Sequence, residues 1–169
     1  QPMRRLDQGL GKVGVEVAEV AVVDRPLARS SRPSLEDDAR CFELPAEQHL
    51  REWLMSVAES EKKPIWEVNY IFCSDEHLRG INVEFLDHDY YTDIITFDYG
   101  DEARMQGEIY ISIERVAENA QAHGVSFANE LCRVMVHGVL HIAGYGDKTP
   151  EQEAVMRQKE DFYLAKLPL

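Results

Sequence analysis

The stretch from Ser126 to Asp147 constrains the fold more than any other part of this chain. Ser126 is a good helix N-cap, and the residues from Phe127 to Ile142 continue as one helical pattern. His137 and His141 are four residues apart, so a helix places their Cβ atoms about 5 to 6 Å apart on one face. The two imidazoles can therefore converge on one ion.

Two glycines mark the end of the same helix. Gly144 and Gly146 can take the left-handed conformation that stops a helix and reverses the chain, which brings Asp147 back over the histidines. Two neutral imidazoles and one carboxylate, with a fourth position open to water, form a catalytic rather than a structural zinc arrangement. We predict that His137, His141 and Asp147 bind one divalent metal ion, with zinc as the expected ion.

The residue after the first histidine separates this pattern from that of zinc proteases. Helical zinc proteases carry HExxH, in which the glutamate polarises the attacking water, whereas this chain has Gly138 at that position. Peptide hydrolysis by that mechanism is therefore disfavoured. The remaining histidines lack ligand-type partners and are expected on the surface or in loops: His49, His77, His88 and His123.

Helical and strand-like patterns alternate along the rest of the chain from residue 44. The spacing of Leu50, Trp53, Leu54, Val57 and Ala58 predicts an amphipathic helix. Further strands are predicted at 66–72, 93–99 and 107–112, and further helices after Ser74, at 114–121 and from Thr149 to Lys166. These alternating patterns predict an α+β domain in which helices cover a small sheet.

The first 40 residues differ in composition and contain a linker-like run from Arg29 to Ser34. We expect residues 1–40 to be an N-terminal extension or loosely attached segment and residues 41–169 to form one metal hydrolase domain. Alternating valines in the extension also allow a strand near 13–23.

Charge and cysteine content narrow the expected partners and location. The net charge of -13 disfavours long-range attraction to RNA, so RNA binding would need a local basic lip or a protein partner. Cys41, Cys73 and Cys132 are far apart and form no CxxC pair, which predicts reduced, buried thiols. No run reaches the roughly 18 apolar residues of a membrane helix, and we expect a cytoplasmic protein.

Four ordered segments resemble the signature of the YbeY family of metal-dependent endoribonucleases. The segment HGVLHIAGYGDK at 137–148 resembles HGxLHLxGYxH, in the branch that ends with aspartate. Thr92–Phe97 is similar to T-[DN]-[VI]-[LI]-[ST]-F, and Gly107–Ser112 to G-[DE]-I-x-I-S. With Phe72–Asp75, these segments extend the resemblance over about residues 42–166.

The resemblance implies a zincin-like fold: a mixed sheet of about four strands, with helices around a central metal-bearing helix. It also implies a zinc ion, cleavage of single-stranded RNA, and a role in ribosomal RNA maturation, including the 3′ end of 16S rRNA, and in ribosome quality control. The implied partners are ribosomal RNA and the ribosome or its proteins.

Two positions depart from the common family pattern. Asp147 stands where most members have a third histidine, and its harder oxygen ligand can loosen the preference for zinc. Leu86, in the loop expected at 86–91, stands where many members carry an arginine that is thought to help bind or cleave RNA. A basic contact must then come from elsewhere, and the candidates are Arg133, Lys148 and Arg79.

The residues that act on the substrate are less sharply predicted. Thr92, Asp93 and Arg133 are candidate catalytic residues, although Thr92 and Asp93 are equally expected simply to start a strand. Glu108 is a candidate base or an orienting partner for a ligand histidine. Attack by water and attack by the ribose 2′-OH both remain open.

Two other functions also remain open. One is metal-dependent hydrolysis of a small phosphoester or a peptide, and the other is a ribosome-assembly role with a structural metal. The net acidity and Leu86 favour these functions over a bare nuclease.

Overall fold

A computed structural model of the chain describes residues 12–17, 44, 46–88 and 92–167. Over these residues the chain has the predicted α+β architecture, with a four-stranded sheet and five helices. The elements follow one another as β1 (Lys12–Val17), α2 (Glu47–Ser60), β2 (Ile65–Cys73), α3 (Asp75–Leu86), β3 (Ile94–Asp98), β4 (Met105–Ser112), α4 (Ile113–His123), α5 (Phe127–Ala143) and α6 (Pro150–Leu164).

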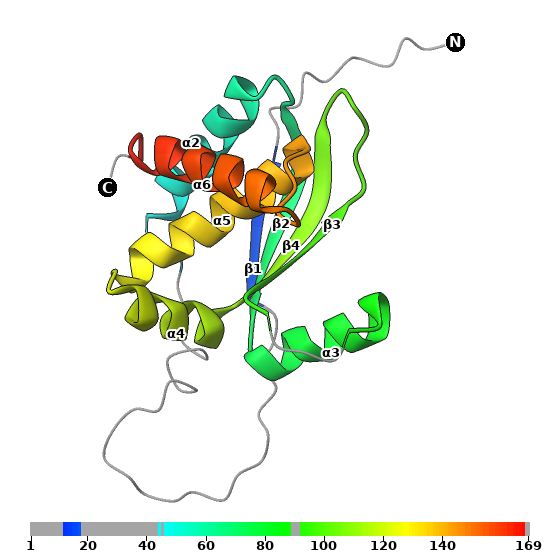
Figure 1. The fold of residues 1–169 in the computed structure, drawn as a ribbon. Helices are drawn as coiled ribbons and strands as arrows, with labels where there is room; N and C mark the ends of the chain where they lie inside the picture. Colours follow the sequence, from blue (N-terminus) through cyan, green and yellow to red (C-terminus); the bar gives the residue numbers. More distant parts are fainter. Residues whose placement is uncertain (1–11, 18–43, 45, 89–91, 168–169) are drawn as a thin grey trace, which may run out of the picture.

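The sheet is mixed, as predicted, and its strand order is β1-β2-β4-β3 (Figure 1). β1, β2 and β4 are parallel, whereas β3 runs antiparallel to β4 and lies at the edge of the sheet. The hairpin between β3 and β4 pairs Phe97 with Glu108, and Asp101 stabilises its turn by accepting hydrogen bonds from the N–H groups of Ala103 and Arg104.

Helices cover the two faces of the sheet unequally. Ile109 and Ile111 of β4 belong to the main core, which joins the sheet to α2, α5 and α6. Tyr110, between them, points to the opposite face and packs with the smaller cluster around Leu78 of α3, because side chains alternate along a strand. The α5 helix is thus enclosed between the sheet and other helices, as Figure 1 shows.

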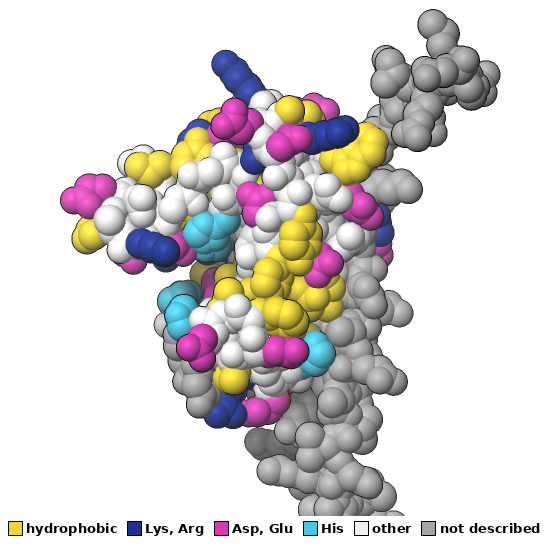
Figure 2. Space-filling model, turned by 90° about the vertical axis from the view of Figure 1, so that its right-hand side faces the viewer, with side chains coloured by type: hydrophobic (Ala, Val, Ile, Leu, Met, Phe, Trp, Pro, Cys, Tyr) yellow, Lys and Arg dark blue, Asp and Glu magenta, His cyan; other side chains and the backbone are white. Residues whose placement is uncertain are grey.

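The α3 side of the sheet is more open. Phe85 of α3 is 63% exposed, and its ring contacts that of Phe97, which also contacts Tyr99 and Tyr110. Figure 2 shows hydrophobic side chains gathered on this side of the molecule, with acidic side chains around them.

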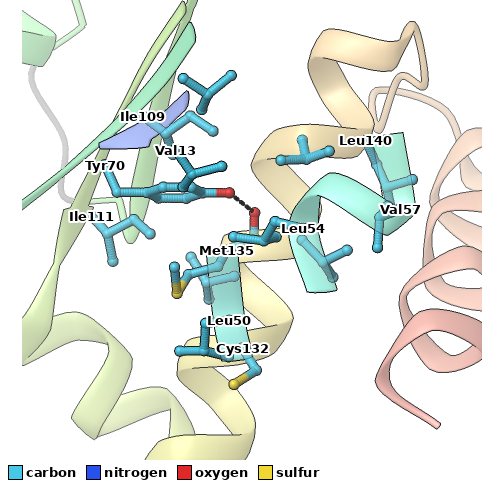
Figure 3. Close-up of a cluster of buried hydrophobic side chains, with 14 of the residues drawn as sticks. Val13, Leu50, Leu54, Val57, Tyr70, Ile109, Ile111, Cys132, Met135 and Leu140 are labelled. Carbon is cyan, nitrogen blue, oxygen red and sulfur yellow. Dashed lines mark hydrogen bonds between the residues drawn. The ribbon is translucent and has the colours of Figure 1, made fainter. Parts of the chain in front are cut away.

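A hydrogen bond in the main core ties α5 to the sheet. The Tyr70 hydroxyl, fully buried on β2, donates to the carbonyl oxygen of Met135 at 2.7 Å (Figure 3). Between residues 130 and 142 every side chain of α5 is buried except three, which lie four residues apart: Arg133, His137 and His141. Burial of the rest of α5 therefore leaves one accessible stripe, and the stripe contains both predicted histidine ligands.

Local predictions of helix starts are confirmed. The hydroxyl groups of Ser74, Ser126 and Thr149 each accept a hydrogen bond from the backbone N–H three residues later, as N-caps of α3, α5 and α6. Element bounds differ from the predicted ones by up to two residues. In particular, Leu86 is the last residue of α3 and not part of the loop that follows it.

The strand expected near residues 13–23 is present as β1, and residues 18–23 lie outside the described residues. β1 pairs with β2 along its whole length, and Val13 is 2% exposed in the main core. We propose that the folded domain includes β1, although composition alone predicts a boundary near residue 40. A truncation tests this boundary.

Two of the three cysteines match the prediction of buried, reduced thiols. Cys73 and Cys132 are free and buried, and burial raises their pKa to about 12 and about 11, respectively. Cys41 lies outside the described residues. In the part of the chain that the structure describes, no helix has both the length and the apolar character needed to cross a membrane.

Candidate metal centre

The end of α5 brings the three predicted ligands together. Gly144 has a φ of +115° and closes the helix, with its own N–H and that of Tyr145 bonded back to the carbonyl oxygens of His141 and Leu140. Glycine takes this left-handed conformation without strain. The chain then reverses and places Asp147 against the accessible stripe of α5, as the sequence predicts.

The distances among the three side chains fit a metal ion. Asp147 Oδ2 lies 3.1 Å from His141 Nε2 and 3.3 Å from His137 Nε2, and the three ligand atoms all lie within 4.8 Å of one another. Ligands about 2.0 Å from a tetrahedral zinc ion are separated by about 3.3 Å along each edge. Both nitrogen–oxygen distances are therefore close to one edge of such a site.

The other nitrogen of each imidazole is also occupied. His137 Nδ1 lies 2.9 Å from Glu160 Oε2, and His141 Nδ1 lies 2.9 Å from the carbonyl oxygen of Tyr145. Both partners are acceptors, so a neutral ring that donates to them from Nδ1 keeps the lone pair of Nε2 for a metal ion. The rings themselves meet edge to face, with centroids 4.4 Å apart. This arrangement orients both histidines for ligation before any ion binds.

Glu160 is a residue of the candidate site that reasoning from the sequence missed. Its side chain is only 7% exposed, and besides His137 it contacts Arg133 Nη1 at 3.1 Å and Arg157 Nη1 at 3.7 Å. A signal was present, because Glu160 lies on the buried face of α6 between Met156 and Tyr163 at helical spacing. A glutamate on an apolar stripe needs a charged or hydrogen-bonding partner.

Carboxylates dominate the electrostatics around His137. Burial alone would lower the pKa of His137. The hydrogen bond and charge of Glu160, with the charges of Asp147 and Asp93, have a larger effect in the opposite direction, so the pKa lies above its ordinary value. Burial raises the pKa of Asp93, and the charge of His137 opposes this shift only in part. The ligand set thus lies in a negative environment that favours a cation.

An open groove of about 890 Å³ runs over the ligands, between β3 and the helices α5 and α6. Thr92 and Asp93 lie in its wall where the chain enters β3, with the Thr92 hydroxyl donating to the Ile94 carbonyl at 3.4 Å. Asp93 accepts a hydrogen bond of 3.5 Å from Asn119. The basic side chains that line the groove are Arg133, Lys148 and Arg157, and Leu86 also lines it.

Other candidates lie elsewhere or are already paired. Glu108 points to the face of the sheet opposite α5 and accepts a hydrogen bond from the Tyr110 hydroxyl at 2.8 Å, so the suggestion that it orients a ligand histidine is wrong. Arg79 is not among the described residues of the groove and pairs with Glu76 at 3.6 Å. The four other histidines are exposed, as expected, although His123 also lines the groove.

Gly138 has a steric reason to be glycine. A Cβ atom at this position would lie 2.9 Å from Ile109 Cδ1 and 3.2 Å from Ile94 Cδ1, because α5 packs directly on the sheet there. The glutamate that a zinc protease carries at this position has no space in this packing. The structure therefore agrees with the prediction that the HExxH mechanism is disfavoured.

Comparisons with known proteins identify the family and agree with the fold. The family model described as Endoribonuclease YbeY matches residues 35–168. Proteins named Endoribonuclease YbeY from Cytophaga hutchinsonii and Flavobacterium johnsoniae are each 50% identical, over 73% of this chain and 87% and 89% of their own lengths. The solution structure of TM1509 from Thermotoga maritima is 30% identical and superposes with a TM-score of 0.56, covering 74% of this chain and 85% of that one. The chain belongs to the YbeY family.

Proposed function

We propose that this chain is a metal-dependent endoribonuclease that cuts single-stranded RNA during ribosomal RNA processing. One observation carries the proposal: three ligand atoms converge under an open groove, in a chain whose relatives are named endoribonucleases. The residues that line the groove run along β3 from Thr92 to Asp98, which suits an extended RNA strand better than a single small molecule.

In this proposal His137 Nε2, His141 Nε2 and Asp147 Oδ2 hold one divalent ion. A set of two imidazoles and one carboxylate, with both nitrogen–oxygen distances close to a tetrahedral edge, favours zinc. A bound ion would lower the pKa of a water molecule and offset charge that develops on the phosphate oxygens. Glu160 holds the ring of His137, and the carbonyl of Tyr145 holds that of His141.

The groove residues then position the RNA. Lys148 and Arg157 are exposed at its rim and supply contacts to the RNA phosphates. They compensate for the arginine that many family members carry at the position of Leu86. Asp93 Oδ2, in the groove wall, accepts a proton or a hydrogen bond from the attacking hydroxyl, and Thr92 contacts the strand beside it. Arg133 lines the groove but is bonded to Glu160 and Asp161, at 3.1 and 2.7 Å, which favours a supporting role over a phosphate contact.

The finer assignments extend the same proposal. The substrate is ribosomal RNA, with the 3′ end of 16S rRNA as the processed site, and the ribosome or its proteins deliver it in the cytoplasm. Delivery by a protein partner follows from the net charge of -13, which opposes capture of free RNA at a distance.

Cleavage of a short RNA, labelled at one end, tests the proposal. The purified protein should cut a single-stranded oligonucleotide, stop when a chelator removes the metal, and recover when zinc is returned. It should cut the same sequence poorly in a duplex. His137→Ala should be inactive under all conditions, and cleavage by that variant would point to a contaminating nuclease.

Two further measurements distinguish the attacking group and separate the nuclease from an assembly factor. A single 2′-deoxy substitution at the scissile nucleotide abolishes cleavage if the 2′-OH attacks, and has little effect if water attacks. A protein that binds zinc stoichiometrically but never cuts RNA, alone or with ribosomes, would instead support the assembly-factor function, which the acidic charge favours.

A further inference from the structure

Glu61, at the C-terminal end of α2, makes a cluster of contacts that the proposed reaction does not use. Its side chain is 9% exposed and accepts hydrogen bonds from the Tyr145 hydroxyl at 2.7 Å, from Lys159 Nζ at 2.9 Å and from the Tyr163 hydroxyl. Three donors on one nearly buried carboxylate make a strong, charge-assisted anchor. Its partners come from α6 and from the loop that carries Asp147.

Tyr145 connects this anchor to the metal ligands. Its hydroxyl donates to Glu61, while its backbone carbonyl accepts the Nδ1 proton of His141 at 2.9 Å. It stands between Gly144 and Gly146, two residues that restrain the backbone least. The tyrosine side chain is therefore a main restraint on a loop that orients one ligand and, two residues later, supplies another.

A second contact from the same turn supports this connection. Lys63 Nζ donates to the carbonyl oxygen of Ile142 at 3.0 Å, in the last turn of α5. The turn after α2 thus makes one hydrogen bond to the end of the metal-bearing helix α5 and another to the loop that carries Asp147. Both contacts span large separations in sequence, and both are polar contacts at the border of the main core, against which the ring of Tyr145 packs.

We infer that Glu61 is a positioning residue for the metal centre and that it acts through the hydroxyl of Tyr145. The inference rests on the proposed metal site and adds a restraint outside it. Without the Glu61–Tyr145 hydrogen bond the ring of Tyr145 loses its fixed end. The carbonyl that orients His141, and the Asp147 that follows, then sample a wider range of positions.

Glu61 also joins α2 to α6 through Lys159 and Tyr163, so removing it would weaken the fold as well as the site. The chain offers a matched pair that separates these effects. Tyr145→Phe removes the arm that reaches the ligand loop, together with the contact of the same hydroxyl with Lys159. Tyr163→Phe removes an arm that reaches α6 and leaves the ligand loop unchanged. Each variant removes one hydroxyl group that donates a hydrogen bond to the Glu61 carboxylate.

The test is zinc affinity, measured by competition with a chromophoric chelator in the absence of RNA. We expect Tyr145→Phe and Glu61→Gln to bind zinc about tenfold more weakly, at the lower end of the range for residues that support metal ligands. Tyr163→Phe should stay within twofold of the unaltered protein. The visible spectrum of the cobalt-substituted protein should change in Tyr145→Phe and not in Tyr163→Phe.

Melting temperatures of the metal-free forms complete the test by showing that all variants fold. Unchanged affinity in Tyr145→Phe, or an equal loss in Tyr163→Phe, would overturn the inference. A double variant of Glu61→Gln with Tyr145→Phe should bind no more weakly than either single variant, because both act through one hydrogen bond. Additive losses would also count against it. Failure of the nuclease proposal leaves these measurements unaffected, since they contain no RNA.

Discussion

Replacing Glu160 by glutamine should weaken metal binding without unfolding the protein. The substitution keeps the shape of the side chain and an oxygen that can accept the Nδ1 proton of His137, now 2.9 Å away, but it removes the negative charge. Loss of a supporting partner of a metal-bound histidine typically costs 10- to 100-fold in affinity, or about 1.4 to 2.7 kcal/mol.

The surroundings of Glu160 place the expected loss near the lower end of this range. Its burial, with 7% of the side chain exposed, limits screening by solvent and favours a large effect. However, Arg133 and Arg157 lie 3.1 and 3.7 Å away and already offset part of the charge that His137 senses. We therefore expect a loss of about tenfold.

Chelator competition at neutral pH measures this loss directly. Glu151→Gln is the control, because Glu151 is exposed on the same helix and is not one of the described residues that line the groove. If Glu160→Gln binds zinc within twofold of the unaltered protein, the charge of Glu160 does not support His137. An equal loss in both variants would instead indicate a general effect of net charge.

Three further changes test the ligand set, the packing of the sheet and the domain boundary. Asp147→Asn should weaken zinc binding markedly, because an amide has no charge and is a poor zinc ligand, whereas Asp147→His should keep it, because an imidazole is a good one. If a titration gives the asparagine variant the same zinc affinity as the unaltered protein, Asp147 is not a ligand. Gly107→Ala should lower the free energy of unfolding by about 1–3 kcal/mol, since its Cβ would lie 2.3 Å from the Phe97 carbonyl oxygen. Gly80→Ala, which meets nothing within 4 Å in exposed α3, should instead raise it by up to about 1 kcal/mol, so denaturant unfolding of the pair must give opposite signs. A chain that starts at residue 38 should still bind one metal but melt at a lower temperature, because it lacks β1, and an unchanged melting temperature would place β1 outside the domain.

Patterns that are local in sequence predicted much of the fold. The helix from Phe127 to Ile142 was predictable because its cap, its apolar periodicity and its terminal glycine all lie within one stretch of chain. The same holds for the metal ligands, since His137, His141 and Asp147 lie within eleven residues and one turn joins them. Geometry this local depends little on how distant elements pack.

The parts that escaped prediction depend on long-range contacts. Glu160 meets His137 across 23 residues, and Glu61 meets Tyr145 across 84, so nothing near either glutamate in sequence identifies its partner. Glu108 was misassigned because its strand was predicted correctly but the direction of its side chain was not. That direction depends on which face of the sheet α5 covers, and the neighbouring Ile109 shows that α5 covers the other face.

The charges in the groove suggest an order in which ligands bind. The described residues that line it include six acidic side chains and three basic ones: Asp93, Asp98, Glu130, Asp147, Glu153 and Glu160 against Arg133, Lys148 and Arg157. Arg133 is already bonded to two carboxylates, which leaves still less positive charge for an RNA phosphate. A groove of this kind attracts a divalent cation, and the bound cation weakens the repulsion of a polyanion. RNA affinity should therefore fall sharply when a chelator removes the metal, even for an oligonucleotide that cannot be cut, and an affinity that does not change would show that RNA binds elsewhere on the protein.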